Sequence, residues 1–275
     1  MPEGHTLHRL ANALADAFAG RQVRVSSPQG RFAESAALLD GSELLGCEAW
    51  GKHLLIEFGS DRIVHVHLGL IGGFDVREAA SPAAQGAVRL RIETPDAHAD
   101  LRGPTACELW TADQVEALTA RLGPDPLRDD ADPDRAWARI GRSKVSVASL
   151  LMDQSIVSGV GNVYRAELLF RHRIDPFLEG RLLRQREWQS MWSDLCALMA
   201  EGVKTGRIDT VRPEHEPEAM GREPRVDDHG GEVYVYRRTG ESCFVCGTGV
   251  RREVHAGRNL FWCPRCQRRS RRRPR

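Results

Sequence analysis

The sequence predicts an α+β protein whose first part is rich in strands and whose second part is helical. Three observations support this prediction. Brief apolar and alternating runs follow one another between residues 22 and 110, a spacing typical of a β-sandwich or barrel. Beyond residue 133 the apolar residues recur at helical spacing. Two C-x2-C pairs near the end of the chain indicate a small metal-bound module.

The first element is a short amphipathic helix that follows the opening tripeptide and ends at Gly20, a residue suited to a C-cap. Its apolar face consists of Leu7, Leu10, Ala11, Leu14, Ala17 and Phe18. The strands are expected in the runs VRVSS, HLLIEF, RIVHVHL, AVRLRI and ACELW. The run TADQVEALTARLG then predicts a second helix, capped by Thr111 or Asp113 and ended by Gly123.

A segment rich in Pro and Asp, GPDPLRDDADPD, marks the expected domain boundary. We expect an N-terminal domain over residues 1–123, a linker over 124–134, a helical domain over 135–240, a zinc ribbon over 241–269 and a basic tail over 270–275. Helices within the second part are predicted at residues 133–140, 144–153, 162–172 and 181–203.

Length and composition are those of a folded intracellular protein. A chain of 275 residues with 41% hydrophobic residues can form two domains with cores of their own. No apolar run approaches the roughly 20 residues of a membrane helix. The N-terminus also lacks the basic and apolar regions of a secretion signal. We therefore expect no membrane partner.

The formal net charge of +1 hides a strongly basic C-terminus. Residues 251–275 contain ten arginines against one acid, Glu253. Arginine forks match phosphate oxygens, so this end of the chain indicates a polyanion partner. The terminal run 268–275, taken alone, is interpreted as a solvated, disordered tail.

The seven cysteines divide into three isolated thiols and one cluster. The isolated ones lie among apolar neighbours, which favours small buried thiols over disulfides; they are Cys47, Cys107 and Cys196. The clustered ones form the pattern C-x2-C-x16-C-x2-C and comprise Cys243, Cys246, Cys263 and Cys266. This spacing predicts one structural zinc ion with full coordination. Redox pairs and an iron–sulfur cluster are the alternatives.

Between the two pairs the chain can form a hairpin that turns near Ala256 and Gly257. Arg258 would lie at or just past the turn. Alone it could be an ordinary solvated arginine. Together with Arg251 and Arg252 on a metal-held ribbon, it becomes a candidate probe for a nucleic-acid groove.

The turn Ser158-Gly159-Val160-Gly161 directly precedes a predicted helix that begins at Asn162. The unpaired N–H groups at a helix start, the positive end of its dipole and the Asn162 amide would share one direction. Gly161 and Asn162 are therefore candidate anion ligands. A plain tight connection between two helices is the alternative reading.

The opening hexapeptide MPEGHT places a secondary amine beside a carboxylate if Met1 is removed. A terminal α-amino group has a pKa of about 7.7 to 8.0, so Pro2 would be partly unprotonated near neutral pH. Pro2 and Glu3 could then perform carbonyl chemistry.

Two histidines, His65 and His67, share one face of a predicted strand. With no third ligand in view, packing or a phosphate contact is favoured there over a metal site.

Six motifs in order resemble the formamidopyrimidine-DNA glycosylase and endonuclease VIII family across nearly the whole chain. They are MPEGHT, WGKHLLIEF, HVHLGL, LMDQSIVSGVGNVYRAE, YRRTGESCFVCG and GRNLFWCPRCQ. The opening Pro-Glu-Gly is similar to that of the actinobacterial endonuclease VIII-like branch.

The resemblance implies a catalytic N-terminal β-sandwich and a helix-two-turn-helix domain with a zinc ribbon. It also implies a bifunctional DNA glycosylase and abasic-site lyase of base excision repair, which nicks by β,δ-elimination. By motif position Pro2 is the nucleophile and Glu3 the proton shuttle, while Lys52, Asn162 and Arg258 contact phosphates. Lys52 by itself reads as a surface lysine at a strand end. The implied setting is a monomer acting on damaged DNA in the bacterial cytoplasm, associated with the nucleoid.

Departures from the family's purine-directed branch concern three positions. Leu70 replaces the usual Met, Arg102 lacks an Arg-Phe-Gly continuation, and Thr6 stands where many members have a second Glu. Leu70 and Arg102 remain candidate DNA contacts. We therefore expect oxidised pyrimidines as substrates. The alternatives are oxidised purines, dedicated uracil removal, or a non-catalytic zinc-ribbon DNA-binding protein.

Overall fold

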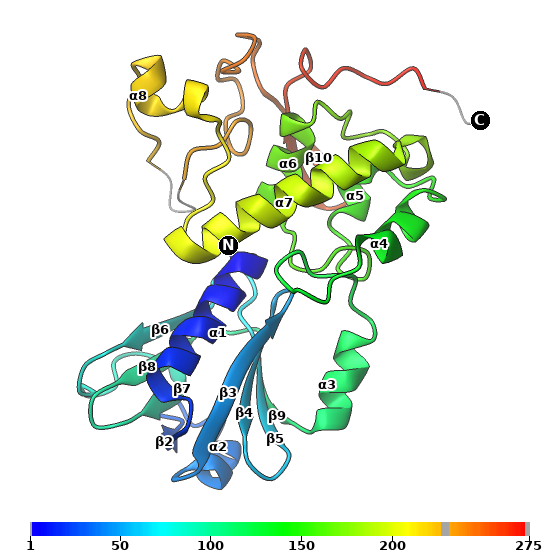
Figure 1. The fold of residues 1–275 in the computed structure, drawn as a ribbon. Coiled ribbons are helices and arrows are strands. Elements are labelled where there is room, and N and C mark those ends of the chain that lie inside the picture. Colours follow the sequence, from blue (N-terminus) through cyan, green and yellow to red (C-terminus); the bar gives the residue numbers. More distant parts are fainter. Residues whose placement is uncertain (1, 227–230, 273–275) are drawn as a thin grey trace. The chain divides into compact units, whose positions relative to one another are not determined.

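The computed structural model describes residues 2–226 and 231–272 of the chain. These residues form two compact units that divide between Arg121 and Leu122 (Figure 1). The first unit contains the two larger sheets, and the second contains one long helix, several short helices and a two-stranded hairpin. The predicted α+β class is confirmed.

The first unit contains two antiparallel sheets around one apolar core. The five-stranded sheet has the order β1-β3-β4-β5-β9, with bounds Arg21–Gln22, Glu43–Trp50, His53–Phe58, Arg62–His67 and Ala106–Trp110. The four-stranded sheet has the order β2-β7-β8-β6, with bounds Arg24–Ser26, Val88–Glu93, His98–Arg102 and Gly73–Arg77. Ile56 from one sheet and Leu101 from the other belong to the same buried cluster. The expected sandwich of sheets is therefore present.

Three helices accompany these sheets. The amphipathic helix α1, Gly4–Phe18, buries Leu7, Leu14 and Phe18 against the core and packs on β3 and β4. Gly20 follows it with φ +74°, a conformation that glycine adopts without strain. Helices α2, Ala33–Leu39, and α3, Ala112–Thr119, complete the unit. A capping box of Thr111 and Gln114 begins α3.

The second unit is built from short helices around one long one. Its elements are α4 Pro133–Ile140, α5 Val147–Leu150, α6 Asn162–Arg171, η1 Gly180–Leu182, α7 Gln185–Thr205, η2 Pro213–His215, α8 Pro217–Met220, β10 Arg251–His255 and β11 Arg258–Trp262. The helix predicted at 144–153 is wrong in its extent. Ser146 caps α5, and the chain leaves the helix after Leu150. The helix predicted at 181–203 begins later, at Gln185, after a 3-10 turn.

Helix α6 lies at the centre of the second unit and is buried from Asn162 to Phe170. Its Glu167 carboxylate accepts hydrogen bonds of 2.7, 2.8 and 2.8 Å from the backbone N–H groups of residues 234–236 and one of 2.7 Å from the Thr210 hydroxyl. A buried carboxylate needs such donors. Glu167 therefore fixes the segment that leads into the zinc ribbon.

Part of the predicted solvated tail is attached to the second unit: the prediction is wrong for residues 269, 270 and 272, whereas Arg271 is exposed. The Arg269 guanidinium lies 3.5 Å from the centre of the Phe177 ring. The Ser270 N–H donates to Asp175, and Arg272 forms a bidentate pair with Glu187 at 2.6 and 2.7 Å. The remaining residues of the predicted tail, 273–275, lie outside the described residues.

Candidate functional site

Pro2 and Glu3 lie at the beginning of α1. Pro2 is half-buried and Glu3 is fully buried. The Glu3 backbone is extended, and its carbonyl accepts the first helical hydrogen bond, from the Thr6 N–H at 2.9 Å. The arrangement holds a carboxyl group in a sheltered position one residue from Pro2.

Lys52 lies in the two-residue turn between β3 and β4, where Gly51 takes φ +58°. Three imidazoles gather on the same part of the sheet. His53 Nδ1 lies 2.9 Å from His65 Nε2, and the ring centres of His53 and His67 are 5.1 Å apart. His53 is the third histidine that sequence analysis missed. The antiparallel register brings it there, since Leu54 pairs with Val66 and Leu55 with His65.

The charge of this histidine group is set mainly by burial. Burial lowers the pKa of His53 to about 3, with additional lowering by His65, His67 and Lys52. Burial also lowers the pKa of His65 to about 4, against an opposing contribution from Glu108. The His65 ring stacks on Trp110 at 3.8 Å. At neutral pH these imidazoles are therefore uncharged.

The loop between β5 and β6 carries two solvent-exposed apolar side chains. Leu70 is 61% exposed and Ile71 is 90% exposed. The Gly72 N–H donates to the Leu68 carbonyl at 3.1 Å, which closes the loop into a tight turn. Gly69 has φ +71°, and a Cβ there would collide with Thr105, so only glycine fits. Sequence analysis selected Leu70 and missed Ile71.

Arg102, another predicted DNA contact, is already engaged within its own sheet. Its guanidinium donates to Asp100 at 2.8 Å and to the Gln85 carbonyl at 3.3 Å. Asp100 also accepts a bidentate pair from buried Arg91 at 2.6 and 2.8 Å. These arginines hold the pKa of the Asp100 carboxyl below its usual value, against the opposing effect of burial. A DNA contact by Arg102 stays a prediction.

In the second unit the structure brings Asn162 together with the hairpin that carries Arg258. Gly161 is the extended N-cap of α6. The Asn162 side-chain N–H donates to the Asn259 carbonyl at 3.0 Å, and Arg165 donates to the same carbonyl at 3.0 Å. Arg165 also donates to the Asn162 side-chain oxygen. Asn162 is thus buried and holds the hairpin, besides any role with a ligand.

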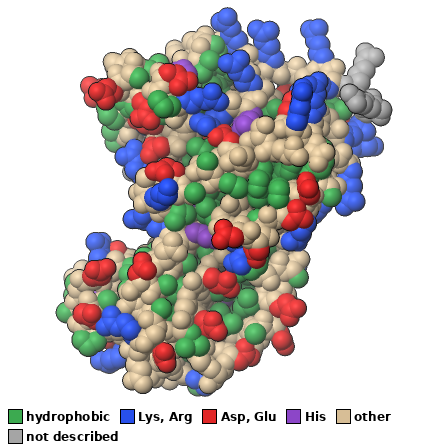
Figure 2. All heavy atoms as spheres, in the orientation of Figure 1, with side chains coloured by type: hydrophobic (Ala, Val, Ile, Leu, Met, Phe, Trp, Pro, Cys, Tyr) green, Lys and Arg blue, Asp and Glu red, His purple; other side chains and the backbone are tan. Residues whose placement is uncertain are grey.

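The hairpin of β10 and β11 is antiparallel and turns at Ala256 and Gly257, as predicted, with φ +48° and +75°. Arg258 is exposed and pairs in register with His255. Arg251 and Arg252 are exposed at the other end of β10. On the face in Figure 2, Lys and Arg side chains gather over the second unit.

The four clustered cysteines fit a single tetrahedral metal ion. Their sulfur atoms all lie within 4.8 Å of one another, with 3.9 Å between Cys243 and Cys266 and 3.4 Å between Cys246 and Cys263. Four sulfurs at the usual zinc distance would be about 3.8 Å apart. The zinc prediction is confirmed. Because all four ligands come from the protein, the ion is structural.

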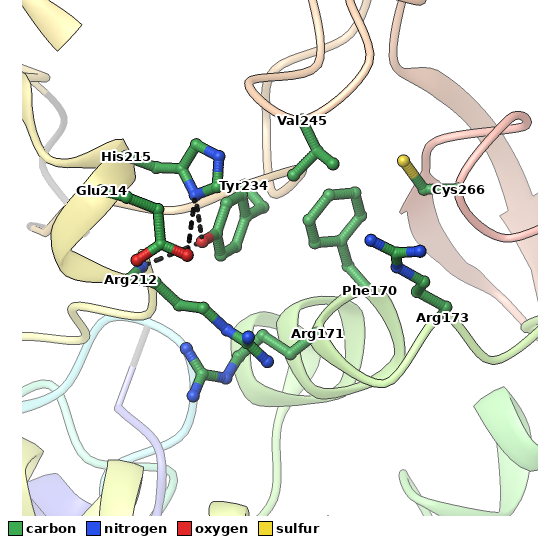
Figure 3. A pocket seen from close by; sticks show the side chains of 9 residues that line it. All are labelled: Phe170, Arg171, Arg173, Arg212, Glu214, His215, Tyr234, Val245 and Cys266. Carbon is green, nitrogen blue, oxygen red and sulfur yellow. Dashed lines mark hydrogen bonds and ion pairs between the residues drawn. The ribbon is translucent and has the colours of Figure 1, made fainter.

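A cavity of about 110 Å³ lies beside the last turn of α6 (Figure 3). The Tyr234 hydroxyl accepts from the Arg212 backbone N–H at 2.9 Å and lies 3.0 Å from His215 Nδ1. Arg171, on the same wall, forms a bidentate pair with Asp194 at 2.6 and 2.7 Å. The polar groups here are thus mostly satisfied by one another. Sequence analysis gave no signal for this cavity.

Three family models match the chain. They are described as Formamidopyrimidine-DNA glycosylase N-terminal domain, matching residues 1–107, Formamidopyrimidine-DNA glycosylase H2TH domain, matching residues 122–213, and Zinc finger found in FPG and IleRS, matching residues 240–269.

Relatives and solved structures agree with these models. Endonuclease 8 1 of Mycobacterium tuberculosis is 50% identical over 97% of this chain and 100% of its own length. Formamidopyrimidine-DNA glycosylase of Thermus thermophilus is 32% identical over 97% of each chain. A complex of Lactococcus lactis Fpg with DNA containing an abasic site has a similar fold, with a TM-score of 0.79 and 23% identity over 97% of this chain and 100% of that one.

Within the described residues, no helix has the length and apolar character needed to cross a membrane.

Proposed function

Because the chain belongs to the formamidopyrimidine-DNA glycosylase and endonuclease VIII family, we propose that it excises oxidised pyrimidines from DNA. Members of this family are DNA glycosylases and abasic-site lyases, and the chain is such an enzyme of base excision repair.

Pro2 is the proposed nucleophile once Met1 has been removed. Its amine attacks C1′ of the damaged nucleotide, a C1′–N bond forms, and the bond from C1′ to the base breaks. The amine gives up its one proton, which leaves with the base. The C1′–O4′ bond then breaks, O4′ takes a proton, and the C1′–N bond becomes the double bond of an iminium ion. Covalent catalysis of this kind divides base removal into two easier steps. Elimination of the 3′ and then the 5′ phosphate from the ring-opened sugar nicks the strand, and water releases the enzyme.

Glu3 is the proposed proton carrier. Its full burial keeps water from competing for the proton, and its position next to Pro2 suits protonation of the sugar ring oxygen as the ring opens. This buried carboxyl group beside Pro2 is the single observation that most strongly supports a catalytic protein over a non-catalytic DNA-binding one.

Phosphate contacts are proposed for Lys52, Asn162 and Arg258. Lys52 lies next in sequence to His53, one of the imidazoles that burial leaves neutral. The Asn162 amide has a second N–H besides the one that it gives to Asn259. Arg258 is exposed on a metal-held hairpin. Weaker DNA contacts are proposed for Gly161, Arg251, Arg252 and Arg102.

Leu70 and Ile71 are proposed to fill the space that the damaged base leaves when it is flipped out. Flipping costs a few kcal/mol of lost stacking and pairing. Apolar side chains inserted between base steps offset part of that cost. The exposure of both side chains on a closed turn supports this role, because folding leaves their apolar surface available.

Oxidised pyrimidines are the proposed substrates because Leu70 and the sequence after Arg102 depart from the purine-directed pattern, and because the 50% identical relative is named Endonuclease 8 1. Oxidised purines are the second candidate, since relatives named Formamidopyrimidine-DNA glycosylase are up to 33% identical among those compared. We further propose a monomer that acts on chromosomal DNA in the bacterial cytoplasm.

Borohydride trapping tests the assignment of Pro2 and Glu3. Glu3→Gln should lose roughly 10²- to 10⁴-fold in excision of an intact lesion, yet still form a trappable Schiff base with a preformed abasic site, because the aldehyde there needs no leaving base. An uncleaved N-terminal tag should abolish trapping, since it converts the Pro2 amine into an amide. Normal excision by Glu3→Gln, or full trapping by the tagged protein, would show that these residues have other roles.

A further inference from the structure

We propose that His255, held by Ser146 and Ser149, is a positioning residue that fixes Arg258 for its contact with the lesion phosphate. This inference rests on the proposed function, which gives Arg258 that contact. The three residues, with Phe177, are called the hairpin latch below.

The latch joins the hairpin to the beginning of α5. His255 Nε2 lies 2.8 Å from the Ser146 hydroxyl oxygen and 3.0 Å from that of Ser149. The two hydroxyls are 3.0 Å from each other. Hydroxyl protons can rotate to suit either imidazole tautomer, so the triangle is satisfied in both. The Phe177 ring meets the edge of the imidazole at 5.5 Å and an interplanar angle of 89°.

The latch residues on the helical side are themselves well fixed. The α5 N–H groups of Val147 and Ala148 donate to the carbonyls of Leu178 and Pro176 at 2.8 and 3.1 Å. The segment that carries Phe177 therefore also holds the beginning of α5. Arg269 lies over the Phe177 ring, and Trp262 meets it edge-on at 5.3 Å. His255 is thus attached to a rigid part of the unit.

Because of its position in the hairpin, His255 can fix the backbone at Arg258. His255 pairs directly with Arg258 across the two-residue turn. The other residues of β10 are exposed, so this strand has no apolar attachment to the core. The buried residues of β11 are Leu260, Phe261 and Trp262, beyond Arg258 on the side away from the turn. Within the part of the chain that the structure describes, His255 is the β10 residue whose side chain fastens the turn.

A second attachment lies on the other side of Arg258. The carbonyl of the next residue, Asn259, accepts hydrogen bonds from Asn162 and Arg165 at 3.0 Å each. Arg258 therefore stands between two fixed points that come from different helices, α5 and α6. A long arginine side chain loses rotamer freedom when it binds a phosphate, and a moving backbone would add to that loss. A fixed backbone leaves only the side chain to be ordered.

An ordinary packing contact would predict something different. His255 would then contribute to the stability of the hairpin, and its loss would affect DNA binding independently of Arg258. The positioning role instead requires the two residues to act as one unit, so the effects of removing them should not add.

The test is a double-mutant cycle on the full-length, zinc-loaded protein. The affinity is measured for a duplex that carries a reduced abasic site. His255→Leu keeps bulk but removes the ring nitrogens, and we expect it to weaken binding about 3- to 10-fold, the range of a lost hydrogen bond. Ser149→Ala should weaken binding less, because Ser146 remains. Ser190→Ala, on the exposed face of α7, is the matched control and should change nothing.

Three further measurements separate positioning from stability. His255→Gln, whose side-chain amide can reach the same hydroxyls, should recover most of the affinity. The zinc content should stay at one per chain in every variant. In the Arg258→Ala background, His255→Leu should cause no further loss. Additive losses, or an equal loss in His255→Gln and His255→Leu, would overturn the latch while leaving the role of Arg258 intact.

The proposed function fails in a distinguishable way. If Arg258→Ala binds the abasic duplex as well as the unaltered protein, Arg258 has no phosphate contact, and the positioning role falls with it. Hydrogen exchange at the amides of residues 255–259 would then show whether His255 contributes to the stability of the hairpin. Faster exchange in His255→Leu, combined with an additive cycle, likewise assigns His255 to stability alone.

Discussion

Replacing Ile71 by Ala should separate DNA binding from folding. Ile71 is 90% exposed at the tip of a turn whose shape depends on Gly69, Gly72 and backbone hydrogen bonds. Truncating its side chain removes little buried surface from the folded protein. Exposed substitutions of this kind change the free energy of unfolding by about 0.5 kcal/mol or less.

If the Ile71 side chain inserts between bases, its truncation should cost free energy of DNA binding. Each buried methylene is worth about 0.8 kcal/mol, and Ile71→Ala removes three carbon atoms. If most of the side chain is buried in the duplex, the loss on binding is about 2 kcal/mol, or roughly 30-fold in affinity. Leu70→Ala should lose somewhat less, because Leu70 is only 61% exposed and therefore has less free surface to bury.

The assay compares the affinity for a duplex with a flipped abasic analogue, the single-turnover excision rate and the midpoint of thermal unfolding. Leu38→Ala, in α2, is the matched control, since Leu38 is 53% exposed and lies outside the loop. We expect both excision and affinity to fall in Ile71→Ala and to stay unchanged in Leu38→Ala. An unchanged affinity in Ile71→Ala, or a marked fall in its unfolding midpoint, would refute the insertion argument.

Three other predictions concern the metal, the substrate and acidity. Cys263→Ser should lose zinc and lesion-DNA affinity, whereas Arg258→Ala should keep zinc and weaken binding by about 1–3 kcal/mol; finding iron in protein purified without chelator would contradict the metal assignment. In a panel of lesion duplexes, 5-hydroxyuracil, dihydrouracil and thymine glycol should be excised faster than 8-oxoguanine opposite cytosine, and the reverse order would move the chain to the purine-directed branch. Burial depresses the pKa of His5, His53 and His65 to about 4, 3 and 4, below the value of about 6.5 in the unfolded chain. The contribution of these neutral imidazoles to the free energy of unfolding is therefore complete above pH 6.5 and is lost as the pH falls toward 3. Chemical unfolding at pH 7.5 and 4.5 should therefore show lower stability at the acidic pH, and equal stability would mean that these imidazoles are already protonated in the fold.

Local patterns carried most of what the sequence predicted correctly. The helix α1 follows from apolar spacing, and the hairpin turn follows from Ala256-Gly257 between two C-x2-C pairs. Such features depend on neighbours within about one element. The sequence therefore gives them directly, without knowledge of the fold.

Features that depend on register across strands were missed. His53 joins the other two histidines only because β4 and β5 pair with a particular offset. His255 meets Ser146 and Ser149 across more than one hundred positions of sequence. The tail was misjudged for a related reason. A run of arginines is usually solvated, but Glu187 and Phe177 provide partners that composition does not reveal.

Helix α6 holds several segments of the second unit in place, among them the hairpin that carries Arg258. Although it is buried from Asn162 to Phe170, it contains four polar side chains that are held by three other segments: Asn162 and Arg165 by the hairpin, Glu167 by residues 234–236, and Arg171 by Asp194 of α7. A buried charge that loses its partner costs several kcal/mol. Moving the hairpin would take the Asn259 carbonyl away from Asn162 and Arg165, and moving residues 234–236 would take three N–H donors away from Glu167. The cost of each movement is therefore concentrated on one helix, which makes the position of Arg258 a property of the folded unit and not a result of DNA binding.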